Sequence, residues 1–217
     1  MEFLRRKTWG GSMIPVTEQS EPNDFSKKVR NPGQLFLTLK PNPSNKDWKN
    51  REYWRKALPD LYSAYQGVCA YCSEWIPYNT GVSTVDHFEP KGIAPNLAYE
   101  WKNFRLSSLR LNSKKGDYQD VLDPFALQQD TFILDFPSLI VKPNPILSDE
   151  QKNRAIGTIH RLGLNDETSI KSRFRWIRCY CSNEFRFIYL QRNAPFIAYE
   201  LKRQNLKTAI KNIMKMR

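Results

Sequence analysis

The sequence predicts an α+β protein that is mostly helical, and three observations support this class. Residues 148–163 begin with the capping-box pattern Ser148-x-x-Gln151 and end at a glycine, as a helix does. Residues 83–88 read as a short strand. The chain has 217 residues, of which 40% are hydrophobic and 26% charged, which is typical of a globular protein with a full core.

The first 45 residues predict an extended arm with little regular structure, because glycines and prolines interrupt them throughout. Such an arm is either flexible or docks on a partner through Leu35, Phe36 and Leu37. It is the first of three predicted regions, and residues 46–126 and 127–217 form the others.

The central region, 46–126, is expected to start with helices and to continue in the order ribbon, loop, helix. Its expected elements are a helix over 46–56, a helix from Pro59 to Gly67, a turn at 68–72 with a strand on either side, a strand over 83–88, a loop containing Pro90 and Pro95, and a helix over 108–115 closed by Gly116.

The last region, 127–217, predicts mostly helices. The helix over 148–163 is followed by one over 166–177. The segment 184–191 fits a strand or a helix, and a long basic helix is expected from Pro195 onward.

The net charge of +12 is unevenly spread. Residues 171–217 hold 12 basic and 2 acidic side chains, whereas residues 60–126 hold 6 and 8. A basic segment of this kind indicates polyanion binding, a solvated helical face, or docking on a protein partner. We favour docking through Ile210, Ile213 and Met214, because these apolar residues recur at helical spacing.

The chain is expected to be cytoplasmic and without a membrane span. Its start, Met1 to Lys7, lacks the apolar stretch of a secretory signal, and no run of about 18 apolar residues occurs. The four cysteines form the close pairs Cys69-x-x-Cys72 and Cys179-x-Cys181. Such pairs indicate a metal site or free thiols rather than a disulfide framework.

The most informative segment joins an acid, a histidine and two asparagines. Asp86 precedes His87 directly, Asn103 follows His87 by sixteen residues, and Asn112 comes nine residues later. A neutral imidazole can accept a proton from water near pH 7, and the oxygens of Asp86 and Asn112 suit a hard cation such as Mg²⁺. Asn103 fits an orienting role toward the loop or the imidazole. Hydrolysis of a phosphodiester needs these functions together.

At these residues the sequence resembles the HNH nuclease family, with Asn in the last position. The resemblance covers roughly residues 60–126, and the form of the motif is most similar to the HNH subunit of Septu antiphage systems, including those attached to bacterial retrons. The matching patterns are Cys69-x-x-Cys72, Val85-Asp86-His87-Phe88-x-Pro90-Lys91, Ala98-Tyr99-x-Trp101-x-Asn103, Asn112-x-x-Lys115-Gly116-Asp117, Asp123-Pro124 and Leu162-x-Leu164-Asn165.

The resemblance implies a ββα-metal core with Asp86 and Asn112 as metal ligands, His87 as general base and Asn103 as orienting residue. The implied cofactor is Mg²⁺ or Mn²⁺. The implied partner is an ATPase subunit of the ABC/SMC type, with a retron reverse transcriptase and its RNA–DNA as a further partner. DNA is the favoured substrate, and RNA such as tRNA is the alternative. A non-catalytic nucleic-acid-binding or assembly subunit is the competing function.

One departure from the family concerns zinc. Many members hold a structural zinc with four thiolates, but here Ser108 and Leu111 stand at the second pair of positions. Cys69 and Cys72 alone cannot fill a tetrahedral site, so we expect no structural zinc.

Several other residues have two interpretations. Lys91, Lys114 and Lys115 flank the motif and either hold substrate phosphates or are solvated. His160 is expected to be a partly buried structural residue. The tryptophans Trp48, Trp54 and Trp101 are expected in the core rather than as platforms for bases.

Overall fold

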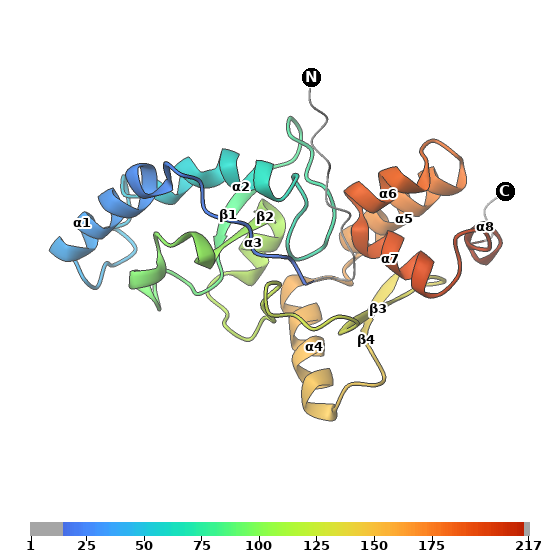
Figure 1. Ribbon diagram of the computed structural model, residues 1–217. Helices are drawn as coiled ribbons and strands as arrows, with labels where there is room; N and C mark the ends of the chain where they lie inside the picture. The colour runs from blue at the N-terminus through green and yellow to red at the C-terminus, as the bar shows by residue number, and fades with distance from the viewer. Residues whose placement is uncertain (1–14, 215–217) are drawn as a thin grey trace, which may run out of the picture.

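The computed structural model describes residues 15–214 and has the expected α+β class, with two small antiparallel sheets among helices (Figure 1). The helices are α1 (Asn31–Leu39), α2 (Leu58–Ala64), α3 (Leu109–Lys115), α4 (Asp149–Leu162), α5 (Glu167–Cys181), α6 (Phe187–Asn193), α7 (Pro195–Arg203) and α8 (Ile210–Ile213). The strands are β1 (Ser83–His87), β2 (Phe104–Ser108), β3 (Phe132–Asp135) and β4 (Ile140–Pro143). Short helical turns are η1 (Ser26–Arg30), η2 (Tyr53–Ala57), η3 (Pro95–Leu97) and η4 (Trp101–Asn103). No helix of the described chain is long and apolar enough to cross a membrane.

The N-terminal arm is only partly extended, which corrects the prediction for residues 1–45. Residues 1–14 lie outside the described part, and 15–22 have no regular structure. The rest folds into η1 and α1, because Pro32 is accepted in the first turn of α1 and Val29 is fully buried. Gly33 lets α1 approach the ring of Tyr99, where an added Cβ would lie 2.1 Å from a ring carbon.

The ribbon is formed by β1 and β2, which pair antiparallel with Ser83 opposite Ser108 and His87 opposite Phe104. The second strand therefore follows the loop, so the predicted order of ribbon, loop, helix is wrong. Residues 68–72 contribute a single bridge, between Val68 and Trp75, rather than two strands.

Helix α3 packs against both strands of this ribbon, and its ends are as predicted. The Ser108 hydroxyl accepts a hydrogen bond from the Leu111 N–H, and Gly116 ends the helix with φ of +50°. The result is a ββα unit that carries Asp86, His87 and Asn112.

Residues 46–56 form turns and part of η2 instead of the expected helix. Asn50 has φ of +64°, a conformation that a helix does not contain. The aromatic residues here are nonetheless core residues, as expected: Trp48 and Trp54 are buried, and their ring centroids lie 5.8 Å apart. Trp101 is also buried.

The C-terminal helices α4 and α5 begin as predicted. Both reciprocal bonds of the capping box between Ser148 and Gln151 are present, and Asp166 caps α5 by accepting from the Ser169 N–H. His160 on α4 is exposed, not partly buried. The hairpin of β3 and β4 was not anticipated, and the ambiguous segment 184–191 becomes helical in α6.

The expected long basic helix is interrupted. Helix α7 ends at Arg203, and Asn205 has φ of +56°, so the chain turns before α8. Ile210 is then buried, and Ile213 and Met214 pack against the core. The apolar residues that we expected to dock on a partner instead contact their own chain.

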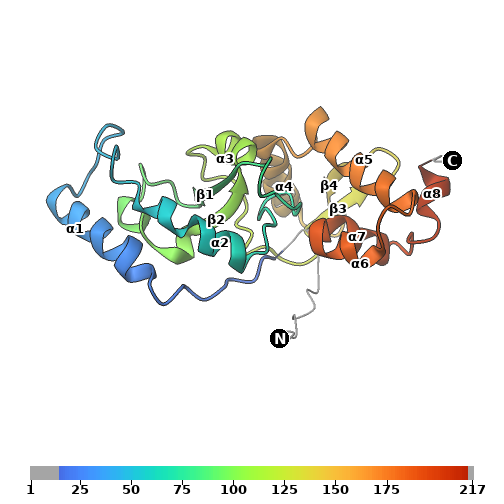
Figure 2. The same cartoon turned by 90° about the horizontal axis from the view of Figure 1, so that it is seen from above.

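The two ends of the molecule are well separated. Helix α1 lies at one end, the β1–β2 ribbon lies with α2 and α3 nearer the middle, and α5 to α8 lie at the other end in both ribbon views (Figures 1 and 2). The ββα unit nevertheless contacts the C-terminal helices, because Arg110 on α3 donates a hydrogen bond to the Ser169 hydroxyl on α5.

Candidate functional site

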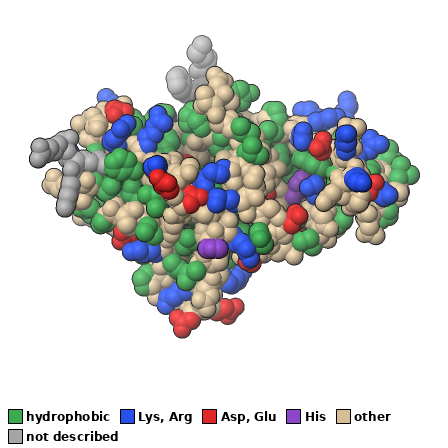
Figure 3. Space-filling model, turned by 180° about the vertical axis from the view of Figure 1, so that it is seen from behind, with side chains coloured by type: hydrophobic (Ala, Val, Ile, Leu, Met, Phe, Trp, Pro, Cys, Tyr) green, Lys and Arg blue, Asp and Glu red, His purple; other side chains and the backbone are tan. Residues whose placement is uncertain are grey.

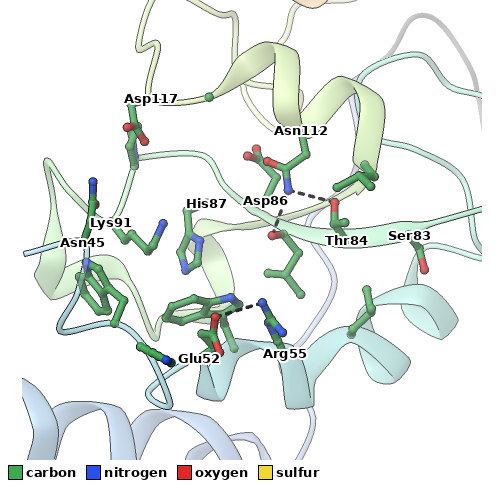
Figure 4. A pocket seen from close by; sticks show the side chains of 18 residues that line it. Asn45, Glu52, Arg55, Ser83, Thr84, Asp86, His87, Lys91, Asn112 and Asp117 are labelled. Carbon is green, nitrogen blue, oxygen red and sulfur yellow. Dashed lines mark hydrogen bonds and ion pairs between the residues drawn. The ribbon is translucent and has the colours of Figure 1, made fainter.

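A cleft of about 780 Å³ lies beside the β1–β2 ribbon (Figure 4). Asp86, His87 and Asn112 line it from β1 and α3, and residues 45–58 contribute much of the rest of its lining. Asp86 and His87 share this cleft although neighbours on a strand point to opposite faces, because His87 is the last residue of β1.

Asp86 is buried, and its carboxylate has two partners inside the protein. The Tyr71 hydroxyl donates a hydrogen bond to one oxygen, and the Lys115 ammonium lies 3.5 Å from the other. Burial raises the pKa of Asp86 to about 6, although Lys115 acts in the opposite direction.

His87 is held edge-on between two aromatic rings, with centroid distances of 4.9 Å to Trp54 and 5.3 Å to Phe104. Its Nε2 lies 2.8 Å from the carbonyl oxygen of Ala98. A carbonyl can only accept, so Nε2 carries the proton and Nδ1 keeps a free lone pair. Burial lowers the pKa of His87 to about 4, so the ring is neutral at pH 7.

Asn103 ties together the loop that connects β1 and β2. Its amide donates to the carbonyl oxygens of Glu89 and Leu97 at 3.0 and 3.1 Å, and its oxygen accepts from the Glu89 N–H at 2.8 Å. Of the two predicted orienting roles, the geometry is that of holding the loop. The imidazole is oriented by Ala98, which belongs to the same loop.

Asn112 projects from α3 beside Asp86 (Figure 4). Its amide nitrogen donates to the Thr84 hydroxyl at 3.0 Å and to the Val85 carbonyl at 3.4 Å. These bonds fix the amide so that its oxygen accepts no hydrogen bond from the described residues. Two oxygen donors side by side, one charged and one free, fit a hard cation that completes its shell with water or phosphate. The residues present therefore fit Mg²⁺ or Mn²⁺.

The three flanking lysines have different environments. Lys115 is fully buried and donates to the His87 carbonyl at 2.9 Å, so it is not the solvated lysine of the second interpretation, and its ammonium is turned toward the protein interior. Lys114 lies 3.3 Å from Asp166 and is not part of the cleft lining. Lys91 does line the cleft, with its ammonium 5.8 Å from the centre of the Trp54 ring.

Sequence reasoning missed the role of Tyr71 as a hydrogen-bond donor to Asp86. A buried tyrosine needs a hydrogen-bond partner for its hydroxyl, and this requirement could have indicated that Tyr71 bonds to a polar residue of the site. The turn thereby supports Asp86 directly.

The cysteines are all free thiols. Burial opposes ionisation of Cys69, but hydrogen bonds from Cys72 and from backbone N–H groups outweigh it and lower the pKa of Cys69. Among residues 15–214, no three His, Cys, Asp or Glu side chains gather as a metal site.

No protein-family model matches the chain. A stretch of 103 residues, 48% of this chain, is 30% identical to the Septu protein PtuB of Bacillus thuringiensis. The match covers 38% of that protein, so the chain spans less than two thirds of its relative. The expected resemblance to a Septu protein is thereby confirmed over about half the length of the chain, whereas the HNH family itself is not shown by this match.

Proposed function

We propose that this chain is a metal-dependent endonuclease of the HNH type, which acts as the effector of a Septu-like antiphage defence system. The observation that carries the proposal is His87 in the cleft beside Asp86, with Nε2 bonded to Ala98 and Nδ1 left as a base. The relationship to Septu protein PtuB supports the setting in defence.

The proposed reaction is hydrolysis of a phosphodiester by in-line attack of water. Nδ1 of His87 takes the proton of the attacking water, and the ring needs no reorientation because Ala98, Trp54 and Phe104 already hold it. A positioned base of this kind contributes on the order of 10²–10⁴ in rate.

Asp86 and Asn112 would hold the metal ion through one oxygen each. When bound, the ion supplies charge neutralisation at the scissile phosphate and the leaving oxygen. Asn103 acts indirectly, because it fixes the loop whose Ala98 carbonyl orients His87.

The proposed substrate is DNA, with RNA such as tRNA as the alternative that the experiment below distinguishes. An ATPase subunit of the ABC/SMC type would control the nuclease, as the resemblance to Septu implies. A retron reverse transcriptase with its RNA–DNA would be a further partner if the system is retron-associated.

A second candidate function is a non-catalytic subunit for nucleic-acid binding or assembly. The observation that favours it is the environment of Asp86, whose two oxygens already have partners in Tyr71 and Lys115. In this alternative the ββα unit is a structural remnant and a partner performs the chemistry.

The deciding experiment triggers the complete defence system in cells and sequences the cleaved nucleic acids. We expect new ends in DNA with the unmodified chain and none with His87→Ala. His160→Ala is the matched control, because His160 is the other histidine and is exposed on α4. Equal cleavage by the His87→Ala variant would support the non-catalytic alternative.

A further inference from the structure

Residues 45–58, here called the wall segment, contribute to the cleft lining that faces the ββα unit. Figure 4 shows Asn45, Glu52 and Arg55 across the cleft from Asn112. The segment is fixed to the loop that connects β1 and β2, because the Tyr99 hydroxyl donates a hydrogen bond to the Arg51 carbonyl at 2.8 Å. Tyr99 directly follows Ala98, whose carbonyl is bonded to His87. The position of the wall relative to His87 is therefore set by the fold.

The wall segment is cationic, and most of its cations form no ion pair with a described residue, although Arg51 and Lys56 lie over the rings of Phe36 and Tyr53. Its two carboxylates are already engaged, since Asp47 lies 3.5 Å from Lys40 and Glu52 lies 3.0 Å from Arg55. Four exposed cations remain that form no ion pair with a described residue, namely Lys46, Lys49, Arg51 and Lys56. On the space-filling face, Lys and Arg side chains are spread over both ends of the molecule, including the end that carries α1 (Figure 3).

A buried donor in the cleft lining lacks a partner. The indole N–H of Trp48 is the one buried side-chain nitrogen or oxygen in the described chain without a hydrogen bond. Trp48 is 3% exposed and lines the cleft next to Lys49. Leaving such a donor unpaired is costly, and an acceptor that enters the cleft would satisfy it.

We propose that the wall segment is the phosphate-binding track of this chain and holds the substrate backbone next to the scissile phosphodiester. Lys49 and the Trp48 N–H contact phosphate oxygens inside the cleft, together with Lys91. Lys46, Arg51 and Lys56 extend the contact outside it. This inference rests on the proposed function and deepens it by assigning the binding residues.

The test measures the affinity of full-length chains for a DNA duplex and for single-stranded DNA and RNA of the same sequence. All chains carry His87→Ala, so that the nucleic acid is bound but not cleaved. The track variant carries Lys46→Gln, Lys49→Gln, Arg51→Gln and Lys56→Gln. Each lost contact should lower the slope of log affinity against log salt by about 0.9 on duplex DNA or about 0.7 on a single strand. We expect affinity at least tenfold weaker and a flatter slope.

The matched control removes four exposed cations from the opposite end, which also form no ion pair with a described residue. Its substitutions are Arg175→Gln, Arg192→Gln, Lys202→Gln and Lys211→Gln. We expect this variant to keep the affinity and slope of the His87→Ala chain. The proposal would be wrong if the track variant kept the same slope of log affinity against log salt, or if the control variant lost as much affinity as the track variant. If the track variant instead keeps nucleic acid but loses a protein partner, the segment is a protein interface and the proposal fails.

A second measurement isolates the indole N–H. Replacing Trp48 by benzothienylalanine keeps the ring size and exchanges N–H for sulfur. We expect about tenfold weaker binding, because a hydrogen bond to a charged phosphate is lost. Unchanged binding would remove Trp48 from the track. If the unmodified chain bound none of the three nucleic acids, both the track and the proposed nuclease function would fail, which distinguishes that result from failure of the track alone.

Discussion

The two ends of the molecule both carry basic side chains, but the structure uses them differently. Residues 171–217 have the larger excess, with 12 basic and 2 acidic side chains. Two of these cations are structural, since Arg173 is buried and donates to the Leu139 and Leu164 carbonyls and Arg203 pairs with the buried Glu200. The wall segment has fewer cations, but one of those without an ion pair to a described residue, Lys49, lines the cleft. Charge counted along a sequence therefore does not show which cations lie at a cleft, whereas the folded structure does.

The two histidines differ in the same way, since His87 lines the cleft and His160 does not. Replacing them gives the largest expected difference in cleavage rate. His87→Ala should lower cleavage by a factor on the order of 10²–10⁴, because the base is lost while the cleft remains. His160→Ala should leave the rate unchanged, since the side chain is exposed on α4 and does not line the cleft. Initial rates on a labelled substrate, with circular dichroism as a check of folding, measure both. Comparable rates for the two variants would contradict the role of His87.

The adjacent residues Lys114 and Lys115 sharpen the comparison between buried and surface charge. Lys115→Met leaves the buried Asp86 carboxylate without its cation and should lower the free energy of unfolding by about 3–5 kcal/mol. Lys114→Met removes a partly exposed ion pair with Asp166 and should cost about 0–1 kcal/mol. Urea denaturation at pH 7.5 compares them. Similar losses would mean that Lys115 does not neutralise Asp86.

Features of the fold were predictable from the sequence where a short, local sequence pattern determines them, and were missed where they depend on residues far apart in the chain. The capping box at Ser148 and the closure of α3 at Gly116 were predictable, because each is a short pattern with its own hydrogen bonds. The pairing of β1 with β2 was not, since the two strands are separated by a loop and neither shows its partner. The break at Asn205 was also missed, because only a non-glycine residue with positive φ marks it.

The candidate site shows the same division. Asp86, His87 and Asn112 were predicted from their types and spacing, and all three line one cleft. Tyr71 and the Ala98 carbonyl were not predicted, because their roles depend on how the turn and the loop fold back on β1. The environment of Lys115 was misjudged for the same reason, since nothing in its sequence neighbourhood indicates full burial.

Asn112 and Asn103 provide a comparison within the site, with a moderate expected effect. Asn112→Ala removes one of the two oxygen ligands that we propose for the metal, so a higher Mg²⁺ concentration should be needed both for binding and for activity. Asn103→Ala should leave Mg²⁺ affinity near that of the unmodified chain, because its bonds go to the loop backbone. Calorimetric titration of the folded proteins with Mg²⁺ gives the affinities. Equal Mg²⁺ affinity for Asn112→Ala and the unmodified chain would make Asn112 a structural residue.

The smallest expected effect is on the zinc content of the protein. It compares the cysteine pair Cys69-x-x-Cys72 with the pair Cys179-x-Cys181. Elemental analysis of the purified protein should find less than one zinc per chain, because Ser108 and Leu111 replace the second thiolate pair. Cys179 and Cys181 cannot readily supply it, since residues two apart on α5 do not face each other. The double variant Cys179→Ser, Cys181→Ser should therefore have the same zinc content as the unmodified chain. Stoichiometric zinc that disappears in this variant would show that α5 completes the site at Cys69 and Cys72. The two segments already meet, because Trp176 of α5 donates a hydrogen bond to Glu74, which follows the Cys69-x-x-Cys72 turn.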